Sequence, residues 1–272
     1  MRRLSPCITA ISLLLSLLSV GFAAEFDAAV LAKIAPRMQQ FVDEVERLVF
    51  YRRRAMIVIS DMMGTLTTGS PVIGLVDWVK HLQSKMQAQL YTASIMPSYF
   101  AAKQGWIDWQ KWGQGLMVGS LKMVKNATPE KMKVIGEWAV EHDLWKKRRA
   151  DVIARLTSHK SNGAQVYIAS SVVEPLIEPF ANRIGAQTIG TPVEYTNGSV
   201  RVAGDLVSQE RKIEQVLSRL GVERVDLAYG DTEQDIPLLE HADYPVAVYP
   251  DEKLRMTALA RGWEILGSRE ID

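Results

Sequence analysis

The sequence contains almost no cysteine. Among its 272 residues the only thiol belongs to Cys7. A single cysteine cannot form a disulfide within the chain, so an internal disulfide framework is excluded. A chain this poor in thiols tolerates an oxidising compartment and equally suits a reducing one, so cysteine content does not decide where the protein resides.

The sequence also lacks a strong charge of either sign. It has 32 basic and 31 acidic residues, a formal charge of +1, which predicts no strong attraction to nucleic acid. A basic cluster at residues 146–149 is typical of a solvated helix face, and we expect no nucleic-acid partner. No internal repeat or low-complexity tract is present, and the length suits one large domain or a core with an insertion.

The amino-terminal residues show the features of an export signal in the usual order. Arg2 and Arg3 precede the uncharged residues 7–24, and the small residues Gly21 and Ala23 occupy positions −3 and −1 of a cleavage site after Ala23. We therefore expect residues 1–23 to be a signal peptide and the protein to be periplasmic or extracellular. An uncleaved membrane anchor through residues 7–24 is the second reading, a buried core helix in a cytoplasmic protein the third.

Residues 25–54 form the next segment. Their apolar residues recur at helical spacing, which predicts an amphipathic helix that packs on the main domain or links it to an anchor. The residues that define this spacing are Val30, Ile34, Met38, Phe41, Val42 and Val45.

Four short apolar runs predict buried strands. They are residues 56–60, 165–169, 225–229 and 245–249, each followed by polar or turn residues. Helical patterns separate the last three, which predicts an α/β fold with a parallel sheet. The segment 193–202 predicts a β-hairpin with a type I′ turn at Asn197-Gly198.

About ninety residues between the first two predicted strands carry almost no strand signal and are too apolar for a disordered loop. We predict an inserted helical domain. Ser70-Pro71 and Thr128-Pro129 each resemble a helix N-cap followed by proline at the first helical position. Trp106, Trp109 and Trp112 recur every three residues, and we expect them to pack in the core of a helical bundle rather than to face a substrate.

Polar side chains follow three of the predicted strands. Asp61 ends the first, Ser170 the second, and Asp231 and Asp235 follow the third, while Lys212 lies on the preceding helix. Taken singly, each Asp or Ser is equally well explained as a helix N-cap. In a parallel sheet whose strands are neighbours, all five side chains converge on one crevice.

These segments resemble the haloacid dehalogenase-like (HAD) hydrolases, in particular the phosphoserine phosphatase-like branch. The matching pieces are "DMMGTLT", "YIASS", Lys212 and "GDTEQD", in the family's order, and the resemblance covers about residues 56–265. It implies a Rossmann-like parallel sheet core at residues 55–70 and 156–272 with a helical cap at residues 71–155. It also implies a hydrolase that acts on a small phosphorylated substrate. The oligomeric state does not follow from it.

The resemblance also implies a role for each matching residue. Asp61 is the nucleophile that forms an aspartyl-phosphate, and Asp61, the Met63 carbonyl, Asp231 and Asp235 hold Mg²⁺. Asp235 also pairs with Lys212. Ser170 and Lys212 hold the substrate phosphate. Gly64 allows the tight turn beside the phosphate, and Thr65 orients this turn.

The sequence departs from the family pattern at two positions. The family's acid/base Asp, two residues after the nucleophile, is replaced by Met63, whose thioether can neither donate nor accept the proton. The Glu that reads the amino group of phosphoserine is replaced by Ser70, so phosphoserine is not the favoured substrate. Two functions remain: an attenuated Mg²⁺-dependent phosphatase, or an inactive pseudophosphatase that acts as a binding or partner protein. A membrane-acting structural protein ranks third, since it leaves the convergent polar residues unexplained.

Overall fold

In the computed structural model the chain divides into two units, residues 1–55 and 56–272. The structure describes residue 40 and residues 55–204, 206–207 and 210–269. The signal peptide or anchor expected at residues 1–23, the tether at 7–24 and the amphipathic helix at 25–54 therefore lie outside the described residues. None of the helices within the described ranges has both the length and the apolar character needed to cross a membrane.

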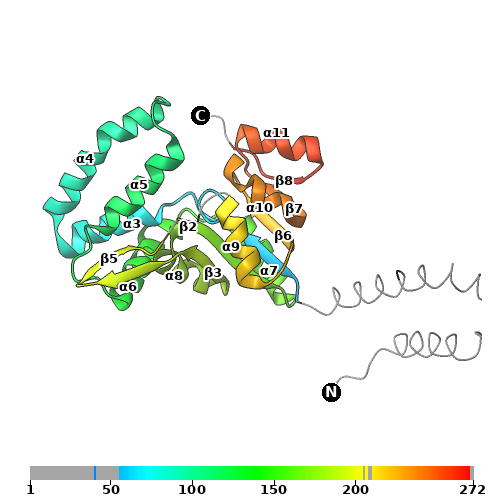
Figure 1. Ribbon diagram of the computed structural model, residues 1–272, viewed down its shortest axis with the longest axis horizontal. Helices are drawn as coiled ribbons and strands as arrows, with labels where there is room; N and C mark the ends of the chain where they lie inside the picture. The colour runs from blue at the N-terminus through cyan, green and yellow to red at the C-terminus, as the bar shows by residue number, and fades with distance from the viewer. Residues whose placement is uncertain (1–39, 41–54, 205, 208–209, 270–272) are drawn as a thin grey trace, which may run out of the picture. The chain divides into compact units, whose positions relative to one another are not determined.

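A six-stranded parallel sheet forms the core of the second unit (Figure 1). The strand order is β3-β2-β1-β6-β7-β8, with β1 in the interior of the sheet. The strands are β1 (Ile57–Ser60), β2 (Gln165–Val173), β3 (Gln187–Thr191), β6 (Val225–Gly230), β7 (Ala242–Val248) and β8 (Glu264–Leu266). This confirms the predicted Rossmann-like α/β fold.

Strand β1 is central because all four of its residues can be buried. The segment "IVIS" has no exposed position, and a strand covered on both faces requires such a continuous apolar run. Ile59 pairs with Tyr167 of β2 on one side and with Ala228 of β6 on the other. The register therefore brings the carboxyl ends of β1, β2 and β6 to the same edge of the sheet.

Helices cover both faces of the sheet, in two hydrophobic clusters. Val58 of β1 belongs to the first, with apolar residues of α7 (Ala150–Ser161) and α8 (Glu174–Ile184). Ile57 and Ile59 belong to the second, on the other face. There the covering helices are α9 (Glu210–Leu220), α10 (Ile236–Glu240) and α11 (Glu252–Arg261). This alternation along β1 is the period of two expected for a strand.

The segment between β1 and β2 is helical, as predicted. It contains α3 (Pro71–Trp78), the π-helical turn η1 (Val79–Gln83), α4 (Lys85–Lys103), α5 (Trp109–Leu121), α6 (Pro129–Ala139) and a second π-helical turn, η2 (Val140–Leu144). Ser70 and Thr128 cap α3 and α6 by accepting hydrogen bonds from Ile73 N and Lys131 N, and each cap is followed by proline, as predicted. Helix α7 continues past residue 155, and the cap bounds 71–155 stay a prediction.

The inserted helices share the first hydrophobic cluster with the sheet. Leu75 of α3, Leu121 of α5 and Ile135 of α6 all belong to it. At Gly136 a Cβ atom would lie 2.7 Å from the Pro175 carbonyl oxygen, so α6 and α8 approach closely. The base of the cap is thus packed against the core and not merely connected to it by two linkers.

A hairpin of β4 (Val193–Thr196) and β5 (Ser199–Val202) forms as predicted. Both turn residues have positive φ, 50° at Asn197 and 74° at Gly198, as a type I′ turn requires. Gly198 O accepts a hydrogen bond of 2.7 Å from Ala127 N, which joins the hairpin to the cap.

The expectation of core packing was wrong for Trp106 and Trp109, whereas Trp112 is partly buried between α4 and α5. Helix α5 begins only at Trp109, so Trp106 lies outside it. Trp106 is 82% exposed and Trp109 53% exposed. The spacing of three residues is also compatible with a loop that leads into a helix, and it carries no information on which side of the helix is covered.

Candidate active site

Asp61 lies directly after β1 and is buried, with 7% of its surface exposed. Its backbone N–H donates to Tyr229 O of β6 at 2.9 Å, so the pairing of β1 with β6 continues one residue past the strand. Because strand pairing fixes its backbone, the carboxylate occupies a defined position at the carboxyl edge of the sheet.

The loop after Asp61 folds back on itself. Leu66 N and Thr67 N both donate to Met62 O, and Gly64 N donates to Thr67 O at 2.8 Å. Met62 is fully buried in the first hydrophobic cluster and anchors the loop. The next residue, Met63, is 39% exposed and faces away from that core.

Gly64 and Thr65 bring this loop against Asp231. Gly64 has a φ of +88°, and a Cβ atom there would lie 2.0 Å from Asp231 Oδ2, so no larger residue fits. The buried Thr65 hydroxyl donates to Asp231 Oδ1 at 3.1 Å. Both residues thus position a carboxylate that follows β6; the roles predicted for them at the substrate phosphate stay predictions.

Asp235 organises the turn after β6. Its Oδ2 accepts hydrogen bonds from Asp231 N at 3.1 Å, from Thr232 N at 3.3 Å and from the Thr232 hydroxyl at 3.4 Å. At Gly230 a Cβ atom would lie 2.4 Å from Asp235 Cβ, so the absence of a side chain there lets the turn close. Asp231 and Asp235 are both 2% exposed.

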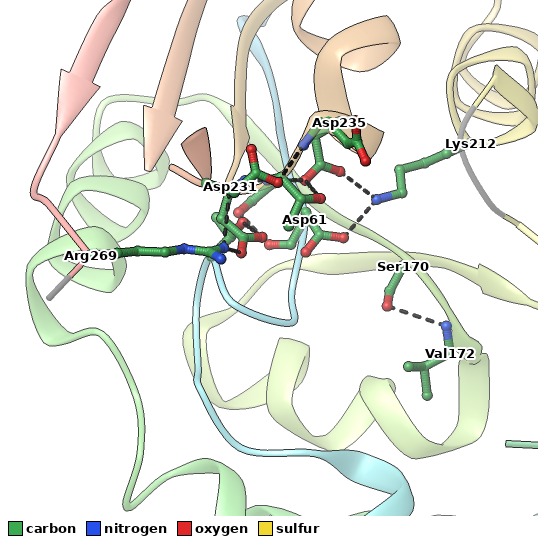
Figure 2. Close-up of polar contacts among 12 residues, drawn as sticks. Asp61, Ser170, Val172, Lys212, Asp231, Asp235 and Arg269 are labelled. Carbon is green, nitrogen blue, oxygen red and sulfur yellow. Dashed lines mark hydrogen bonds and ion pairs between the residues drawn. The ribbon is translucent and has the colours of Figure 1, made fainter. Parts of the chain in front are cut away.

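Lys212 joins two of the carboxylates. From α9 its buried ammonium group donates to Asp61 Oδ1 at 2.7 Å and to Asp235 Oδ1 at 2.8 Å. Figure 2 shows Lys212 and Arg269 approaching the three carboxylates from opposite sides. The predicted convergence of Asp61, Lys212, Asp231 and Asp235 is therefore present in the structure.

The electrostatics of the cluster reflect burial and crowding of like charges. Burial raises the pKa of Asp61 to about 6; Lys212 opposes this shift and Asp235 adds to it. Burial, and then the charges of Asp235 and Asp61, raise the pKa of Asp231 to about 8. Burial alone would lower the pKa of Lys212, but Asp235 and Asp61 hold it above its ordinary value. The cluster therefore favours any additional positive charge.

Ser170 lies within β2 and is 1% exposed. Its Oγ accepts a hydrogen bond from Val172 N at 3.3 Å, on the Lys212 side of the cluster (Figure 2). The pairing of β2 with β3 changes register between Ala169 and Val173, an irregularity at the position of this serine. The structure gives Ser170 no direct contact with the three carboxylates.

Two arginines near the site were not identified from the sequence. Arg269 Nε donates to Tyr249 O at 2.7 Å, and its Nη2 donates to Asp231 O at 3.1 Å and forms an ion pair with Asp231 Oδ2. Arg149 Nε donates to Gly64 O at 2.7 Å, and its guanidinium stacks 3.8 Å from the centre of the Tyr249 ring. Arg269 follows Asp231 by 38 residues in the sequence, and no spacing rule connects them.

The first three residues of the basic cluster at 146–149 are exposed, as expected, but the cluster does not lie on a helix. Residues 145–148 form a turn and an isolated bridge, and α7 begins only at Ala150. Arg149 N donates to Leu66 O at 2.8 Å, which joins this turn to the loop after β1. The last residue of the cluster therefore belongs to the candidate site.

A pocket of about 660 Å³ opens beside the cluster. Met63, Arg149, Tyr249 and Arg269 line it, together with Gly64, residues 68–70 and Ser268. Met63, where the resemblance implies an acid/base Asp, therefore shares a pocket with two guanidinium groups. Ser70 lines the same pocket, where its hydroxyl caps α3.

Comparison with known proteins assigns the chain to a family. A model of the family described as haloacid dehalogenase-like hydrolase matches residues 58–240, and the chain belongs to this family. The match extends from within β1 to the end of α10 and includes the carboxylates, Ser170 and Lys212. The resemblance inferred from the sequence motifs is thereby confirmed.

Two curated relatives match parts of the chain. An inhibition of morphological differentiation protein from Streptomyces azureus is 32% identical over 133 residues, 46% of this chain and 48% of that protein. The phosphoserine phosphatase SerB1 from Mycobacterium tuberculosis is 32% identical over 114 residues, 39% of this chain and 37% of that protein. The matches thus span half or less of these relatives.

A solved structure shares the fold. A protein of unknown function from Bordetella pertussis Tohama I superimposes with a TM-score of 0.63 at 20% sequence identity. The superposition covers 79% of this chain and 99% of that one. At this identity the likeness concerns the fold alone.

Proposed function

We propose that this protein is a Mg²⁺-dependent hydrolase of phosphate esters or anhydrides that acts through an aspartyl-phosphate on Asp61. One observation carries the proposal: Lys212 holds Asp61 and Asp235 by hydrogen bonds of 2.7 and 2.8 Å, and Asp231 lies beside them in the same buried cluster. Family membership and a relative named as a phosphatase agree with it.

The donor set fits a magnesium ion. Carboxylate oxygens of Asp61, Asp231 and Asp235 lie within 4.8 Å of one another, and Mg²⁺ prefers hard oxygen ligands. Burial, and then the neighbouring carboxylates, raise the pKa values of Asp61 and Asp231, and a bound cation would offset both effects. We assign the three acids and the backbone carbonyl of Met63 as ligands. When bound, Mg²⁺ would neutralise charge on the phosphoryl oxygens.

The proposed reaction then proceeds in two steps through a covalent intermediate on Asp61. In the first, an Asp61 carboxylate oxygen forms a bond to phosphorus while the bond to the leaving oxygen breaks and its electrons depart with the leaving group. In the second, water attacks phosphorus, the bond to Asp61 breaks, and inorganic phosphate is released. Lys212 orients Asp61 and neutralises negative charge, and the Ser170 hydroxyl holds a phosphoryl oxygen.

Met63 limits this chemistry. The departing oxygen must take its proton from solvent, because a thioether has none to donate. General acid-base catalysis is worth about 10²–10⁴-fold, so alkyl phosphates should react slowly. Acyl phosphates, anhydrides and aryl phosphates have leaving groups of low basicity and depend less on protonation. We therefore assign the activity to these activated phosphates.

The test is an activity measurement on the full-length protein with Mg²⁺, using acetyl phosphate, pyrophosphate, p-nitrophenyl phosphate and glycerol phosphate. We expect turnover of activated substrates that disappears in Asp61→Asn. The matched control is Asp243→Asn, at an exposed acid of β7 that pairs with Arg224. Turnover that survives in Asp61→Asn would refute the nucleophile assignment.

A pseudophosphatase is the alternative, favoured by the single observation that position 63 carries a methionine. It predicts binding of Mg²⁺ and inorganic phosphate without turnover. Acid-quenching the protein during reaction with radiolabelled acetyl phosphate separates the two functions. Label retained on the wild type and absent from Asp61→Asn supports the hydrolase, whereas binding without label or product supports the pseudophosphatase.

We also propose that residues 1–23 direct export, with an uncleaved membrane tether through residues 7–24 as the alternative. The support is the order of basic start, apolar centre and small residues at positions 21 and 23. Mass spectrometry of the amino terminus of the protein isolated from cells tests this. A protein that begins at residue 24 agrees with cleavage, whereas an intact Met1 on a cytoplasmic protein contradicts export.

A further inference from the structure

The helical hairpin of α4 and α5 extends away from the sheet (Figure 1). Its two helices are joined by a short connection, residues 104–108. Among the described residues, none between 92 and 115 belongs to either hydrophobic cluster or packs against one. The distal part of the hairpin therefore has its own surface, separate from the core and from the candidate active site.

The end of this hairpin is unusually apolar. We call it the aromatic tip, and it comprises Tyr99, Phe100, Trp106, Ile107, Trp109 and Trp112. Phe100 is 55%, Trp106 82% and Trp109 53% exposed. Contiguous exposed apolar surface of this kind marks an interaction site.

The aromatic tip is held in a defined arrangement. The ring of Tyr99 lies 5.9 Å from that of Trp109 and 5.6 Å from that of Trp112, and the two indole rings are 4.9 Å apart. Trp112 Nε1 donates to the Ser98 hydroxyl at 3.1 Å, which ties α5 to α4. The rings are thus assembled before any partner arrives.

The apolar surface continues along α4. Met86, Leu90, Ala93, Pro97 and Phe100 follow one another at spacings of four and three, which places them on one face of the helix. All five are exposed. From Met86 to Phe100 this face is about 21 Å long. A helix with an exposed apolar face can lie with that face against a membrane interface.

The charge of the hairpin indicates what kind of partner it binds. From Ser84 to Asn126 the chain has five lysines, Lys85, Lys103, Lys111, Lys122 and Lys125, and one acid, Asp108. Asp108 caps α5 by accepting from Lys111 N at 2.9 Å. Five lysines and one acid give residues 84–126 a net charge of +4, compared with +1 for the whole chain. A surface that combines exposed indole rings with lysines complements an anionic lipid headgroup region.

We propose that the α4–α5 hairpin docks on an anionic lipid bilayer, with the aromatic tip at the headgroup level and the apolar face of α4 against the membrane. A second copy of the chain is a poorer partner, because a symmetric contact would bring the lysines of both copies together. The proposal is independent of the proposed phosphatase activity.

The experiment uses tryptophan fluorescence of the full-length protein. None of the seven tryptophans lies in residues 1–54, so binding of the apolar amino terminus to lipid produces no direct signal of its own. The protein is mixed with phosphatidylcholine vesicles or with phosphatidylcholine–phosphatidylglycerol vesicles, in which the lipid acyl chains are brominated to quench nearby indoles. We expect quenching in the anionic vesicles and at least threefold less in the neutral ones.

Two pairs of variants locate the contact. Trp106→Phe with Trp109→Phe should remove more than half of the quenching, whereas Trp138→Phe with Trp263→Phe, outside the hairpin, should retain it. Lys103→Glu with Lys111→Glu should weaken anionic vesicle binding about tenfold, and Lys133→Glu, an exposed lysine of α6, should leave it unchanged.

Four results would overturn the proposal. Equal quenching in neutral and anionic vesicles would show that the lysines do not select the lipid. Equal quenching in both tryptophan variants would show that the aromatic tip does not contact the membrane. An absence of quenching together with a dimer in sedimentation that Trp106→Ser dissociates would assign the surface to a second copy. If lipid does not quench a monomeric protein and acrylamide does not quench its Trp106, the surface of the hairpin would be assigned to the chain's own residues 1–54.

Discussion

Met63 presents a 39% exposed thioether to the pocket that also contains Arg149 and Arg269. Its neighbour Met62 is fully buried, so the two methionines have different roles. Met62 anchors the loop in the core, whereas Met63 lines the pocket at the position where the family resemblance implies an acid/base Asp. The side chain at position 63 can therefore be exchanged without disturbing the packing of the loop.

The substitution Met63→Asp should raise hydrolysis of an alkyl phosphate more than that of an aryl phosphate. The new acid can protonate a basic alkoxide, while a phenolate of low pKa gains little. We expect a difference of about 10- to 100-fold, which is about 1.4–2.7 kcal/mol in the barrier. Steady-state rates for glycerol phosphate and p-nitrophenyl phosphate measure it, with Met63→Leu as the control. Equal gains for both substrates in Met63→Asp would show that proton donation is not the limiting step.

At the proposed magnesium site Arg269 would compete with the metal ion for Asp231, because its guanidinium forms an ion pair with Oδ2 of this carboxylate. Arg269→Gln should therefore bind Mg²⁺ about three- to tenfold more tightly, a gain of about 0.6–1.4 kcal/mol. Titration calorimetry at pH 9, above the pKa of about 8 of Asp231, measures the affinity. The control is Arg261→Gln, which removes a guanidinium that pairs with Glu240 on α10. Unchanged or weaker Mg²⁺ binding in Arg269→Gln contradicts the competition.

The sequence identified the residues at strand ends but not those that support them. Asp61, Asp231 and Asp235 were predictable because parallel strands bring their carboxyl ends to one edge of a sheet. Arg149 and Arg269 were not, since their contacts with Gly64 and Asp231 arise from the paths of two connecting segments. Such contacts depend on tertiary packing, which leaves no periodic signal in a single sequence.

At the scale of elements, the contact between α3 and α6 depends on a glycine. At Gly74 a Cβ atom would lie 2.3 Å from Ala139 Cβ and 2.6 Å from Ala139 Cα. Gly74→Ala should lower the free energy of unfolding by about 1–3 kcal/mol, because the helices must move apart. Gly115→Ala in α5 is the matched control, since nothing lies within 4 Å of its Cβ position. This control should gain up to about 1 kcal/mol from helix propensity.

Urea denaturation of both alanine variants measures these changes in the free energy of unfolding. If Gly74→Ala proved as stable as the wild type, the helices would be able to separate without loss, and the close approach at this position would not matter for stability.

Element boundaries show where sequence patterns stop being informative. The predicted strands at residues 56–60 and 225–229 agree with β1 and β6 within one residue. Three of the four residues of β1 are β-branched and apolar, and β6 is mostly apolar apart from Asp226. Strand β2 continues to Val173, beyond the predicted end at residue 169, through the irregular pairing with β3. Strand β3, with the sequence "QTIGT", and the three-residue β8 were missed, since each is too short and too mixed to show a period.

At the scale of the whole molecule, the cluster couples stability to pH. The pKa values of about 6 for Asp61 and about 8 for Asp231 exceed the value of about 3.9 for an unfolded aspartate. Between about pH 4 and 8 these two groups bind more protons in the folded chain than in the unfolded one. Their contribution to the free energy of unfolding of the metal-free protein therefore decreases as the pH rises through this window.

Magnesium should reverse this dependence, because it binds the ionised carboxylates. The rise in melting temperature on adding Mg²⁺ should be larger at pH 9 than at pH 5.5, and at 100 times Kd the stabilisation should be about 2.7 kcal/mol. Thermal unfolding with and without Mg²⁺ at both pH values measures the effect. Asp231→Asn should reduce it, whereas Asp243→Asn should not. A Mg²⁺ effect that is the same at both pH values would argue against proton-coupled binding.

The position of β1 has a consequence for biosynthesis. It is the first strand of the described chain to be made, yet Ile59 finds its partners only at Tyr167 and Ala228. At about 5–20 residues per second, the ribosome needs on the order of ten seconds to deliver the second partner after the first strand has emerged. During this interval β1 is apolar and unpaired, and pairing between strands so distant in sequence is slow to form. The nascent chain therefore stays open for several seconds, during which a chaperone can bind the exposed strand before the core closes.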